Sequence, residues 1–309
     1  MPDSTTEVAR KRTFSWSRIR TYADCPTMYK EKYLGRKIPT KKAKPLALGS
    51  CMAKAMQAFR TGKTQSEVIA AFTEEWVKGG RILDIEKATD PRRSVERGLE
   101  IVRNYMLEFP DEPARVVQPE VAFELPMYVD EASGETIYFQ GRIDGVLKMA
   151  SEGLCIIEDK TTSRLGPSYF AKMKGSSQVL WYLWVSSELG LFNIDEKPTM
   201  PKCIINAIYV HEKNDRFERD ITMRSTRYLE ATRKNLIAWM KHILISEEHD
   251  SFPKNDVDNS ICTAYGGCDY LPLKYVTGER KARILETMYV DMPYHSFYDK
   301  GLEDGVEPT

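Results

Sequence analysis

The spacing of apolar residues in the first third of the chain is typical of helices. Ser15 or Ser17 can cap the first helix, because a serine side chain can accept a hydrogen bond from a free N–H group at a helix start. Trp16, Ile19 and Tyr22 then recur at intervals that place them on one helical face. The sequence therefore predicts an amphipathic helix that begins at one of these serines.

Further helices are predicted before the pattern changes. Pro26 suits the first position of a second helix, where the N–H group that proline lacks would have no helical partner. Another helix begins near Gly49. Two more are expected over 65–78 and 92–109, the second ending before Pro110.

Near Val116 the helical spacing gives way to runs with strand character, separated by turn-like clusters. In chain order we expect strands over 121–129, 137–149 and 154–161, a helix over 176–189, strands over 203–211 and 217–223, and a long helix over 226–247. After Pro253 the sequence is rich in Asn, Asp and Gly and reads as irregular.

This order of elements predicts the α/β class, with a mixed central sheet flanked by helices rather than a bundle or a sandwich. We interpret residues 14–298 as a single domain. Its expected parts are a helical N-terminal region over 14–110, a core over 115–250 and an irregular Cys-containing segment over 251–275. Residues 1–13 are expected to be disordered, and residues 299–309 to form an acidic tail.

Composition adds one feature to this picture, a basic N-terminal region. The chain has 309 residues, and 42% hydrophobic with 29% charged residues is ordinary for a globular protein. The formal net charge is zero, yet between Lys11 and Lys44 there are eleven Lys or Arg residues and only two acids, Asp24 and Glu31. A basic face of this kind is compatible with binding a phosphate backbone but does not require it.

The cysteines fall into two groups. No apolar run is long enough to cross a membrane, and the polar start of the chain lacks the apolar core of a secretory signal, so we expect an intracellular protein with reduced thiols. Three thiols stand among apolar neighbours and are expected to be buried and inert. These are Cys51, Cys155 and Cys203, whereas Cys25, Cys262 and Cys268 stand among polar residues, Pro, Gly and Tyr.

The segments that carry candidate chemistry are Gly141-Arg142-Ile143-Asp144 and Glu158-Asp159-Lys160. Side chains alternate along a strand, so Glu158 and Lys160 should share a face that Asp159 does not. Charged groups on a buried strand are costly unless compensated. Carboxylates of Asp144 and Glu158 would be compensated by a hard cation such as Mg²⁺, and Lys160 could orient or deprotonate a water.

The alternative interpretation is a pair of salt bridges at a sheet edge. For a lone Asp or a lone Glu-x-Lys that interpretation would be preferred. The combination of a Gly-x-x-Asp that ends one strand with a Glu-x-Lys that ends the next favours the catalytic interpretation.

These paired motifs resemble those of the PD-(D/E)xK nuclease superfamily. The segment Gln178-Val179-Leu180-Trp181-Tyr182 is similar to the Q-x-x-x-Y motif of its RecB-like branch, and on a helix Gln178 and Tyr182 share a face. The resemblance implies a restriction-endonuclease-like fold and a metal-dependent deoxyribonuclease. For Trp181 and Trp184 we favour core packing.

The resemblance extends from residue 14 to about residue 275 and includes Cys25, Cys262 and Cys268. In iron–sulfur members of the branch, among them exonucleases of phage and of CRISPR adaptation, one N-terminal and three C-terminal cysteines hold a [4Fe–4S] cluster. That arrangement implies that the Cys-containing segment packs on the N-terminal region.

Two positions depart from the family pattern. The histidine that usually follows Gly49 four residues later is Ala53, and the expected fourth cysteine is Lys274. Lysine does not ligate iron as a thiolate does, and such clusters normally need four ligands. The three remaining cysteines would hold an incomplete cluster, bind zinc with an outside ligand, or bind nothing; a complete cluster is not the interpretation we favour.

Other candidate residues are less specific. Glu120, just before the catalytic strands, would add a carboxylate to the metal site. The basic and aromatic stretch around Trp16 and Arg18 could follow a DNA strand by charge and stacking, although a solvated basic helix explains it equally well. No phosphate-binding loop G-x-x-x-x-G-K-[ST] occurs, so no ATP motor is expected in this chain.

The sequence thus predicts a DNA nuclease, and the resemblance favours an exonuclease that acts on single- or double-stranded ends. Asp144, Glu158 and the backbone carbonyl of Asp159 would hold Mg²⁺ or Mn²⁺, Lys160 would act on water or the phosphate, and Gln178 with Tyr182 would position Lys160 or the DNA. A bacterial or phage source and a helicase or recombinase partner fit this function. The alternative is a catalytically silent DNA-binding or scaffolding subunit that keeps the fold.

Overall fold

A five-stranded mixed sheet lies at the centre of the protein, in the order β11-β10-β7-β6-β3. The computed structural model describes residues 11–40, 44–78, 91–194, 197–256, 260–263 and 267–292. Strands β7 and β10 pair in parallel, and the other neighbours pair antiparallel. The strands are β3 (Val116–Gln118), β6 (Val146–Met149), β7 (Gly153–Thr162), β10 (Lys202–Tyr209) and β11 (Phe217–Met223).

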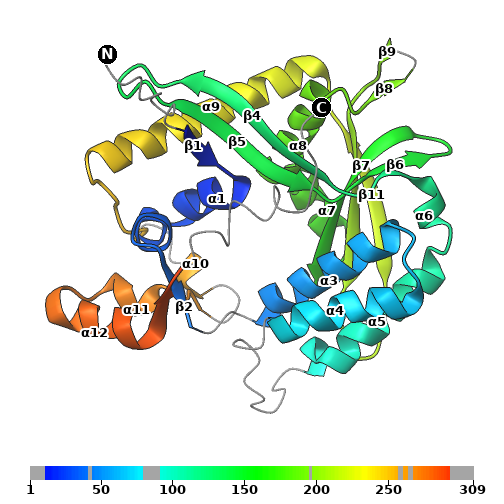
Figure 1. Ribbon diagram of the computed structural model, residues 1–309, viewed down its shortest axis with the longest axis horizontal. Coiled ribbons are helices and arrows are strands. Elements are labelled where there is room, and N and C mark those ends of the chain that lie inside the picture. Colours follow the sequence, from blue (N-terminus) through cyan, green and yellow to red (C-terminus); the bar gives the residue numbers. More distant parts are fainter. Residues whose placement is uncertain are drawn as a thin grey trace, which may run out of the picture.

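A second sheet of three strands, β1-β5-β4, arches away from the first (Figure 1). It consists of β1 (Lys11–Phe14), β4 (Val121–Val129) and β5 (Thr136–Ile143). The expected strand over 137–149 is therefore two strands in different sheets, β5 and β6. The expectation of one continuous strand was wrong because the chain turns at Asp144-Gly145, where Gly145 has φ +156°.

Helices cover both faces of the central sheet (Figure 1). The apolar faces of α3, α4 and α5 form one buried cluster with Ile208 and Val210. Phe170 of α7 packs with Ile205 and Ala207 on the other face. The bounds are α3 (Lys44–Arg60), α4 (Gln65–Lys78), η3 (Pro91–Arg93), α5 (Val95–Glu108), α6 (Glu112–Arg115), α7 (Pro167–Lys174) and α8 (Ser177–Glu188). The expected mixed sheet flanked by helices is confirmed.

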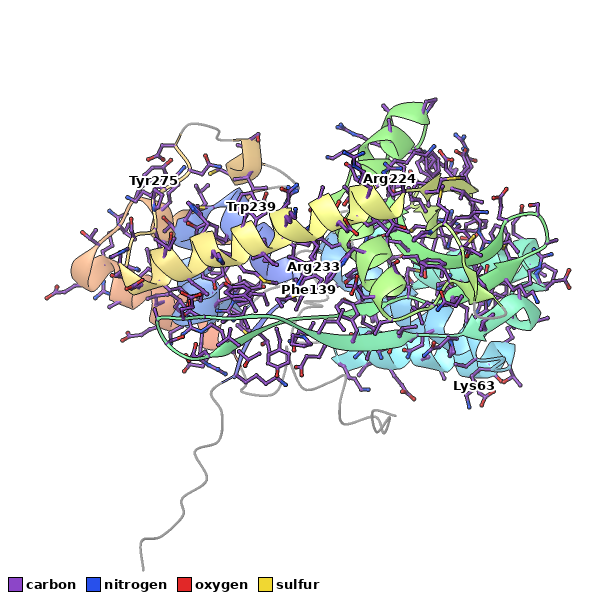
Figure 2. The ribbon with its side chains drawn as sticks, turned by 90° about the horizontal axis from the view of Figure 1, so that it is seen from above. Lys63, Phe139, Arg224, Arg233, Trp239 and Tyr275 are labelled. Atoms are coloured by element: carbon purple, nitrogen blue, oxygen red, sulfur yellow. The ribbon has the colours of Figure 1, made fainter. Side chains whose placement is uncertain are left out.

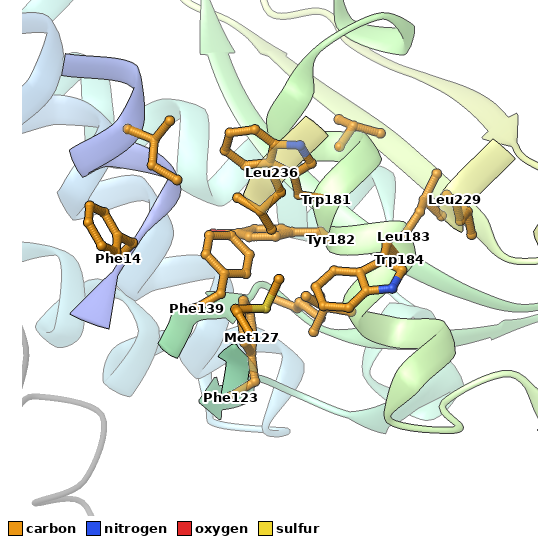
Figure 3. Close-up of a cluster of buried hydrophobic side chains, with 14 of the residues drawn as sticks. Phe14, Phe123, Met127, Phe139, Trp181, Tyr182, Leu183, Trp184, Leu229 and Leu236 are labelled. Carbon is orange, nitrogen blue, oxygen red and sulfur yellow. The ribbon is translucent and has the colours of Figure 1, made fainter. Parts of the chain in front are cut away.

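The largest hydrophobic cluster joins the two sheets to α8 and to α9 (Thr226–Glu248). Figure 3 shows Phe139 of β5 against Trp181 and Tyr182 of α8, with Leu236 of α9 beside them. Trp181 and Trp184 are both buried there, which confirms core packing for the two tryptophans. Helix α9 runs along most of the molecule (Figure 2).

The first residues that the structure describes correct one expectation. Residues 1–10 lie outside the described residues, but 11–13, expected to be disordered, belong to β1, which pairs in parallel with β5. Ser15 caps α1 (Trp16–Asp24), its Oγ accepting a hydrogen bond from the Arg18 N–H at 3.2 Å. The next turns are α2 (Pro26–Tyr29), the π-helical η1 (Lys30–Leu34) and the short strand β2 (Lys37–Pro39).

The C-terminal segment lies against these N-terminal turns. Its elements are α10 (Ser260–Thr263), α11 (Leu271–Lys274), α12 (Gly278–Met288) and β12 (Tyr289–Asp291). Strand β12 pairs antiparallel with β2, and the Tyr270 hydroxyl donates to the Lys37 carbonyl at 2.7 Å. The expectation of an irregular segment was wrong for α12, because the Asn, Asp and Gly residues on which it rested, within 255–267, precede this helix. Ile284 and Leu285 of α12 pack against Tyr270, Leu273 and Tyr289. The predicted acidic tail, 299–309, lies outside the described residues.

Two short strands, β8 (Asn193–Ile194) and β9 (Lys197–Pro198), form a separate hairpin. Within the described segments, no helix combines the length and apolar content that crossing a membrane requires.

Glu247, near the end of α9, ties the N-terminal elements to the core. Its carboxylate accepts from Arg12 at 2.8 Å, from Arg18 at 3.1 Å and from the Tyr29 hydroxyl at 2.5 Å. Burial, together with this carboxylate, raises the pKa of Tyr29. The Glu247 carboxylate of α9 thus binds side chains of β1, α1 and α2.

Glu247→Ala is expected to lower the free energy of unfolding by about 2–3 kcal/mol, because two arginines and a buried hydroxyl lose their common acceptor. Urea denaturation followed by circular dichroism measures the loss. Glu248→Ala, which truncates the exposed neighbour on the same turn, is the matched control and should change stability little. Equal losses in the two variants would contradict the role given to Glu247.

Candidate active site

The turn between β5 and β6 places Asp144 over the middle of β7. A Cβ on Gly145 would lie 3.1 Å from the Pro119 carbonyl oxygen and 3.2 Å from that of Gln118, so only glycine fits this turn without a shift. The Gly145 carbonyl accepts from the Ile157 N–H at 2.9 Å. The Asp144 Oδ2 atom accepts from the Asp159 N–H at 2.8 Å, which fixes the carboxylate against the strand.

Strand β7 presents Glu158 and Lys160 on one face and Asp159 on the other, which confirms the alternation predicted from the sequence. The Lys160 ammonium donates to Glu158 Oε1. The Asp159 carboxylate instead accepts from Arg60 and Asn206.

The carboxylates of Asp144 and Glu158 form an incompletely compensated negative pair. Glu158 is only 2% exposed, and its Oε2 atom has no hydrogen-bond partner among the described residues. Burial raises the pKa of Asp144 well above its usual range, and the charge of Glu158 adds to the effect. Burial also raises the pKa of Glu158, although Lys160 opposes it.

Lys160 is held in its charged form. Burial lowers the pKa of its ammonium, but Glu158 and Asp144 more than offset that effect, and the pKa is raised. One ammonium thus faces two carboxylates, more negative charge than it can balance when both are ionised. A buried carboxylate oxygen without a partner, beside a second carboxylate, fits a hard divalent cation, which prefers oxygen ligands.

Gln178 and Tyr182 lie one turn apart on α8, and their side chains interact with each other. The Tyr182 hydroxyl interacts with the Gln178 side chain and the Arg142 backbone, and burial together with the charge of Glu158 raises its pKa. A Cβ on Gly141 would approach this hydroxyl to 3.3 Å and the Phe123 ring to 2.7 Å. The glycine of the Gly-x-x-Asp motif therefore allows α8 to approach β5 closely.

A cavity of about 240 Å³ opens beside Asp144, between α3 and β5. Ala53, Glu120, Arg142 and Asp144 are among its lining residues, whereas Glu158 is not. Glu120 pairs with Arg142 at 3.2 Å. In the part of the chain that the structure describes, no three His, Cys, Asp or Glu side chains form a group arranged to hold a metal ion.

Arg60 and Asn206, which bind the Asp159 carboxylate, were not predicted as site residues. A signal was present in each case. Arg60 ends α3 four residues after Met56, on the face that is otherwise apolar, and Asn206 interrupts an apolar strand. A polar side chain at a buried position of the repeat needs a partner, and both find it in Asp159.

The three cysteines singled out from the sequence lie near one another. Cys268 donates its backbone N–H to the Cys262 carbonyl at 2.9 Å, and its Sγ atom lies 4.0 Å from the Met28 Sδ atom. Burial raises the pKa of the Cys268 thiol, with smaller effects from Cys262 and Cys25. The other three cysteines are buried among apolar side chains, as expected: Cys51, Cys155 and Cys203.

Lys274 lies beside these thiols and is 4% exposed. Its ammonium donates to the Cys262 Sγ atom at 3.5 Å and to the Asn255 carbonyl at 3.0 Å, and it pairs with Asp256 at 3.0 Å. The hydrogen bond to Asp256 is the main cause of its raised pKa. A cation that donates to one of the three thiols does not fit a cluster that needs four thiolate ligands.

Comparison with known protein families identifies the superfamily of most of the chain. The sequence profile of the PD-(D/E)XK nuclease superfamily matches residues 13–273. A comparison with curated proteins found no match.

Among solved structures, a protein from Eubacterium rectale provisionally assigned as an exonuclease is similar, with a TM-score of 0.50 and 13% identity over 93% of this chain and 98% of that chain. The structure of SSO0001 matches with a TM-score of 0.39 and 10% identity over 87% of this chain and 90% of that chain. At these identities the first likeness concerns the fold alone.

Lys274→Cys should increase iron uptake, because it supplies a fourth thiolate beside Cys25, Cys262 and Cys268. Wild-type protein purified without oxygen is expected to lack stoichiometric iron and acid-labile sulfide. The test is iron and sulfide analysis with visible absorption spectra after reconstitution, and Lys274→Met is the matched control. A complete cluster in the wild-type protein would contradict this prediction.

Asp144→Asn should stabilise the metal-free protein at neutral pH. The raised pKa means that ionisation of Asp144 costs stability, and the cost grows as pH rises from the ordinary Asp value, about 3.9, through the raised folded value. In EDTA at pH 7.5 the variant should melt a few degrees higher, a shift that about 1–2 kcal/mol produces. Its advantage should vanish below about pH 4.

Mn²⁺ should reverse this order at pH 7.5, since only the wild-type protein keeps both carboxylates. Thermal melts with EDTA or Mn²⁺ provide the comparison. A variant that melts below the wild-type protein in EDTA would show that Asp144 is not destabilising in the metal-free state.

Proposed function

The chain belongs to the PD-(D/E)XK nuclease superfamily, and from this premise we propose that it hydrolyses phosphodiester bonds in DNA with a divalent metal ion. The observation that carries the proposal is the meeting of Asp144, Glu158 and Lys160, with one buried carboxylate oxygen of Glu158 left unpartnered. A purely structural salt bridge would not need a second carboxylate beside the first pair.

The carboxylates of Asp144 and Glu158, with the backbone carbonyl of Asp159, are the proposed ligands for Mg²⁺ or Mn²⁺. When bound, such an ion neutralises charge on the scissile phosphate and lowers the pKa of a bound water. Asp144 is prepared for this role because its carboxylate is already fixed by the Asp159 N–H.

Lys160 is the proposed catalytic cation. Its ammonium, held by Glu158 Oε1, is suited to orient the attacking water and to stabilise the negative charge that develops on the phosphate. Gln178 and Tyr182 are proposed to position the DNA backbone or Lys160. The reason is that the buried Tyr182 hydroxyl is close enough to Glu158 and Asp144 for both carboxylates to raise its pKa.

Action from a DNA end is the finer part of the proposal. It rests on the resemblance of the Q-x-x-x-Y motif to that of the RecB-like exonucleases. We propose single- or double-stranded DNA ends as the substrate. The proposed setting is intracellular DNA recombination, repair or phage DNA processing. A helicase or recombinase is the proposed partner, since such proteins act in the same processes.

A catalytically silent DNA-binding subunit is the second candidate. The observation that favours it is Ala53 on the wall of the cavity beside Asp144, where the resemblance leads one to expect a metal-binding imidazole. Wild-type protein that shifts DNA on a gel but never cleaves it in Mg²⁺ or Mn²⁺ would decide for this candidate.

Lys160→Ala should lower the rate of cleavage of linear DNA by about 10²–10³-fold, the loss typical of removing one group that stabilises transition-state charge. The assay follows the release of labelled nucleotides in Mn²⁺ and in EDTA. Lys172→Ala, on the exposed surface of α7, is the control and should cleave like the wild-type protein. Cleavage by Lys160→Ala at the wild-type rate would rule the assignment out.

A further inference from the structure

A polar network lies on the face of β7 opposite Glu158 and Lys160, and two of its members, Arg60 and Asp159, also line the cavity beside Asp144. Asp159 accepts hydrogen bonds from Arg60 Nη1 at 2.6 Å, from Arg60 Nη2 at 2.8 Å and from Asn206 at 2.7 Å. The guanidinium binds both carboxylate oxygens, which fixes direction as well as distance. The side chain between the two candidate catalytic residues is therefore held in one orientation.

Arg60 connects the Asp159 carboxylate to α3, to α6 and to the turn between β5 and β6. It is 3% exposed and ends α3, and its Nε atom donates to Glu112 at 2.8 Å. Its Nη1 atom also approaches the Asp144 carbonyl at 3.4 Å. A single planar group thus contacts both the strand that carries Glu158 and the turn that carries Asp144.

The rest of the network closes around Glu112 and Asn206. Arg219 donates to Glu112, to the Tyr105 hydroxyl at 2.7 Å and to Asn206 Oδ1 at 3.0 Å. Two arginines therefore balance two acids, Glu112 and Asp159. On this face of β7 the charges of the two arginines and the two acids balance, whereas on the other face one ammonium stands against two carboxylates.

We infer that Arg60 is a positioning residue for the metal ligands, an assignment that rests on the proposed nuclease function. By holding the Asp159 side chain it fixes the main chain from Glu158 to Lys160, including the Asp159 carbonyl proposed as a ligand and the N–H bonded to Asp144. Lysine cannot replace it, because one ammonium does not reproduce the planar fork that serves Asp159 and Glu112 together.

Arg60→Lys is therefore expected to weaken Mn²⁺ binding about 10–100-fold, as loss of an outer-shell partner of a metal ligand does. It should lower kcat while KM for DNA stays unchanged. Titration calorimetry with Mn²⁺ alone, at a temperature where circular dichroism shows folded protein, measures the affinity. Arg97→Lys is the matched control: Arg97 is 5% exposed, sits on α5, and binds the His211 carbonyl at 2.7 Å and Asp215, away from the candidate site.

Arg97→Lys should lose stability but bind Mn²⁺ as the wild-type protein does. Unchanged Mn²⁺ affinity in Arg60→Lys, or an equal loss in Arg97→Lys, would overturn the inference. If Arg60→Lys does not fold, Asn206→Ala removes the other donor to Asp159 and should weaken binding severalfold, with unchanged affinity again deciding against it.

Different results would refute the proposed nuclease function and the inference about Arg60. Wild-type protein that binds Mn²⁺ without cutting DNA would refute the nuclease, while the affinity comparison would still decide the role of Arg60. Wild-type protein that binds no Mn²⁺ would overturn both.

Discussion

The structure depends on how β7 carries three successive charged residues, the buried Glu158 and the half-buried Asp159 and Lys160, at the end of its apolar run. Uncompensated charges there would cost far more than the stability of a domain. On one face Asp159 is neutralised by Arg60 and bonded by Asn206. On the other, Lys160 compensates only part of the charge of Glu158 and Asp144. The face of β7 that carries Asp159 therefore stabilises the fold, whereas the face that carries Glu158 and Lys160 is suited to bind a cation.

The surrounding elements bring polar side chains to the charged residues of β7. Parallel pairing with β10 sets Asn206 beside Asp159, and the approach of α8 to β5, allowed by Gly141, brings Tyr182 to the carboxylates. Helix α9 connects the sheets to the N-terminal elements through Glu247, whose three bonds fix α1 and α2. In the C-terminal segment, the Lys274 ammonium similarly bonds the Cys262 thiol of α10 and the Asn255 carbonyl.

Much of the fold could be predicted, because its periodic elements are strongly marked. The helix over 65–78 and the strand over 217–223 have the predicted bounds, and α9 begins at the predicted residue. The failures have physical causes. Strand β1 is short and forms only by pairing with β5, distant in sequence, so it leaves no repeat of its own. The interpretation of the C-terminal segment as irregular rested on the Asn, Asp and Gly residues within 255–267, which precede α12.

For the candidate site, the sequence by itself determined which face of β7 each charge occupies, since alternation along a strand is a local property of the backbone. It also placed Gln178 and Tyr182 on one face of a helix. Only the tertiary structure decided that Asp144 meets Glu158, that Arg60 holds Asp159, and that Lys274 rather than a thiolate lies against Cys262. Such meetings depend on how helices and sheets pack across long sequence separations, and no local pattern encodes the distance between two elements.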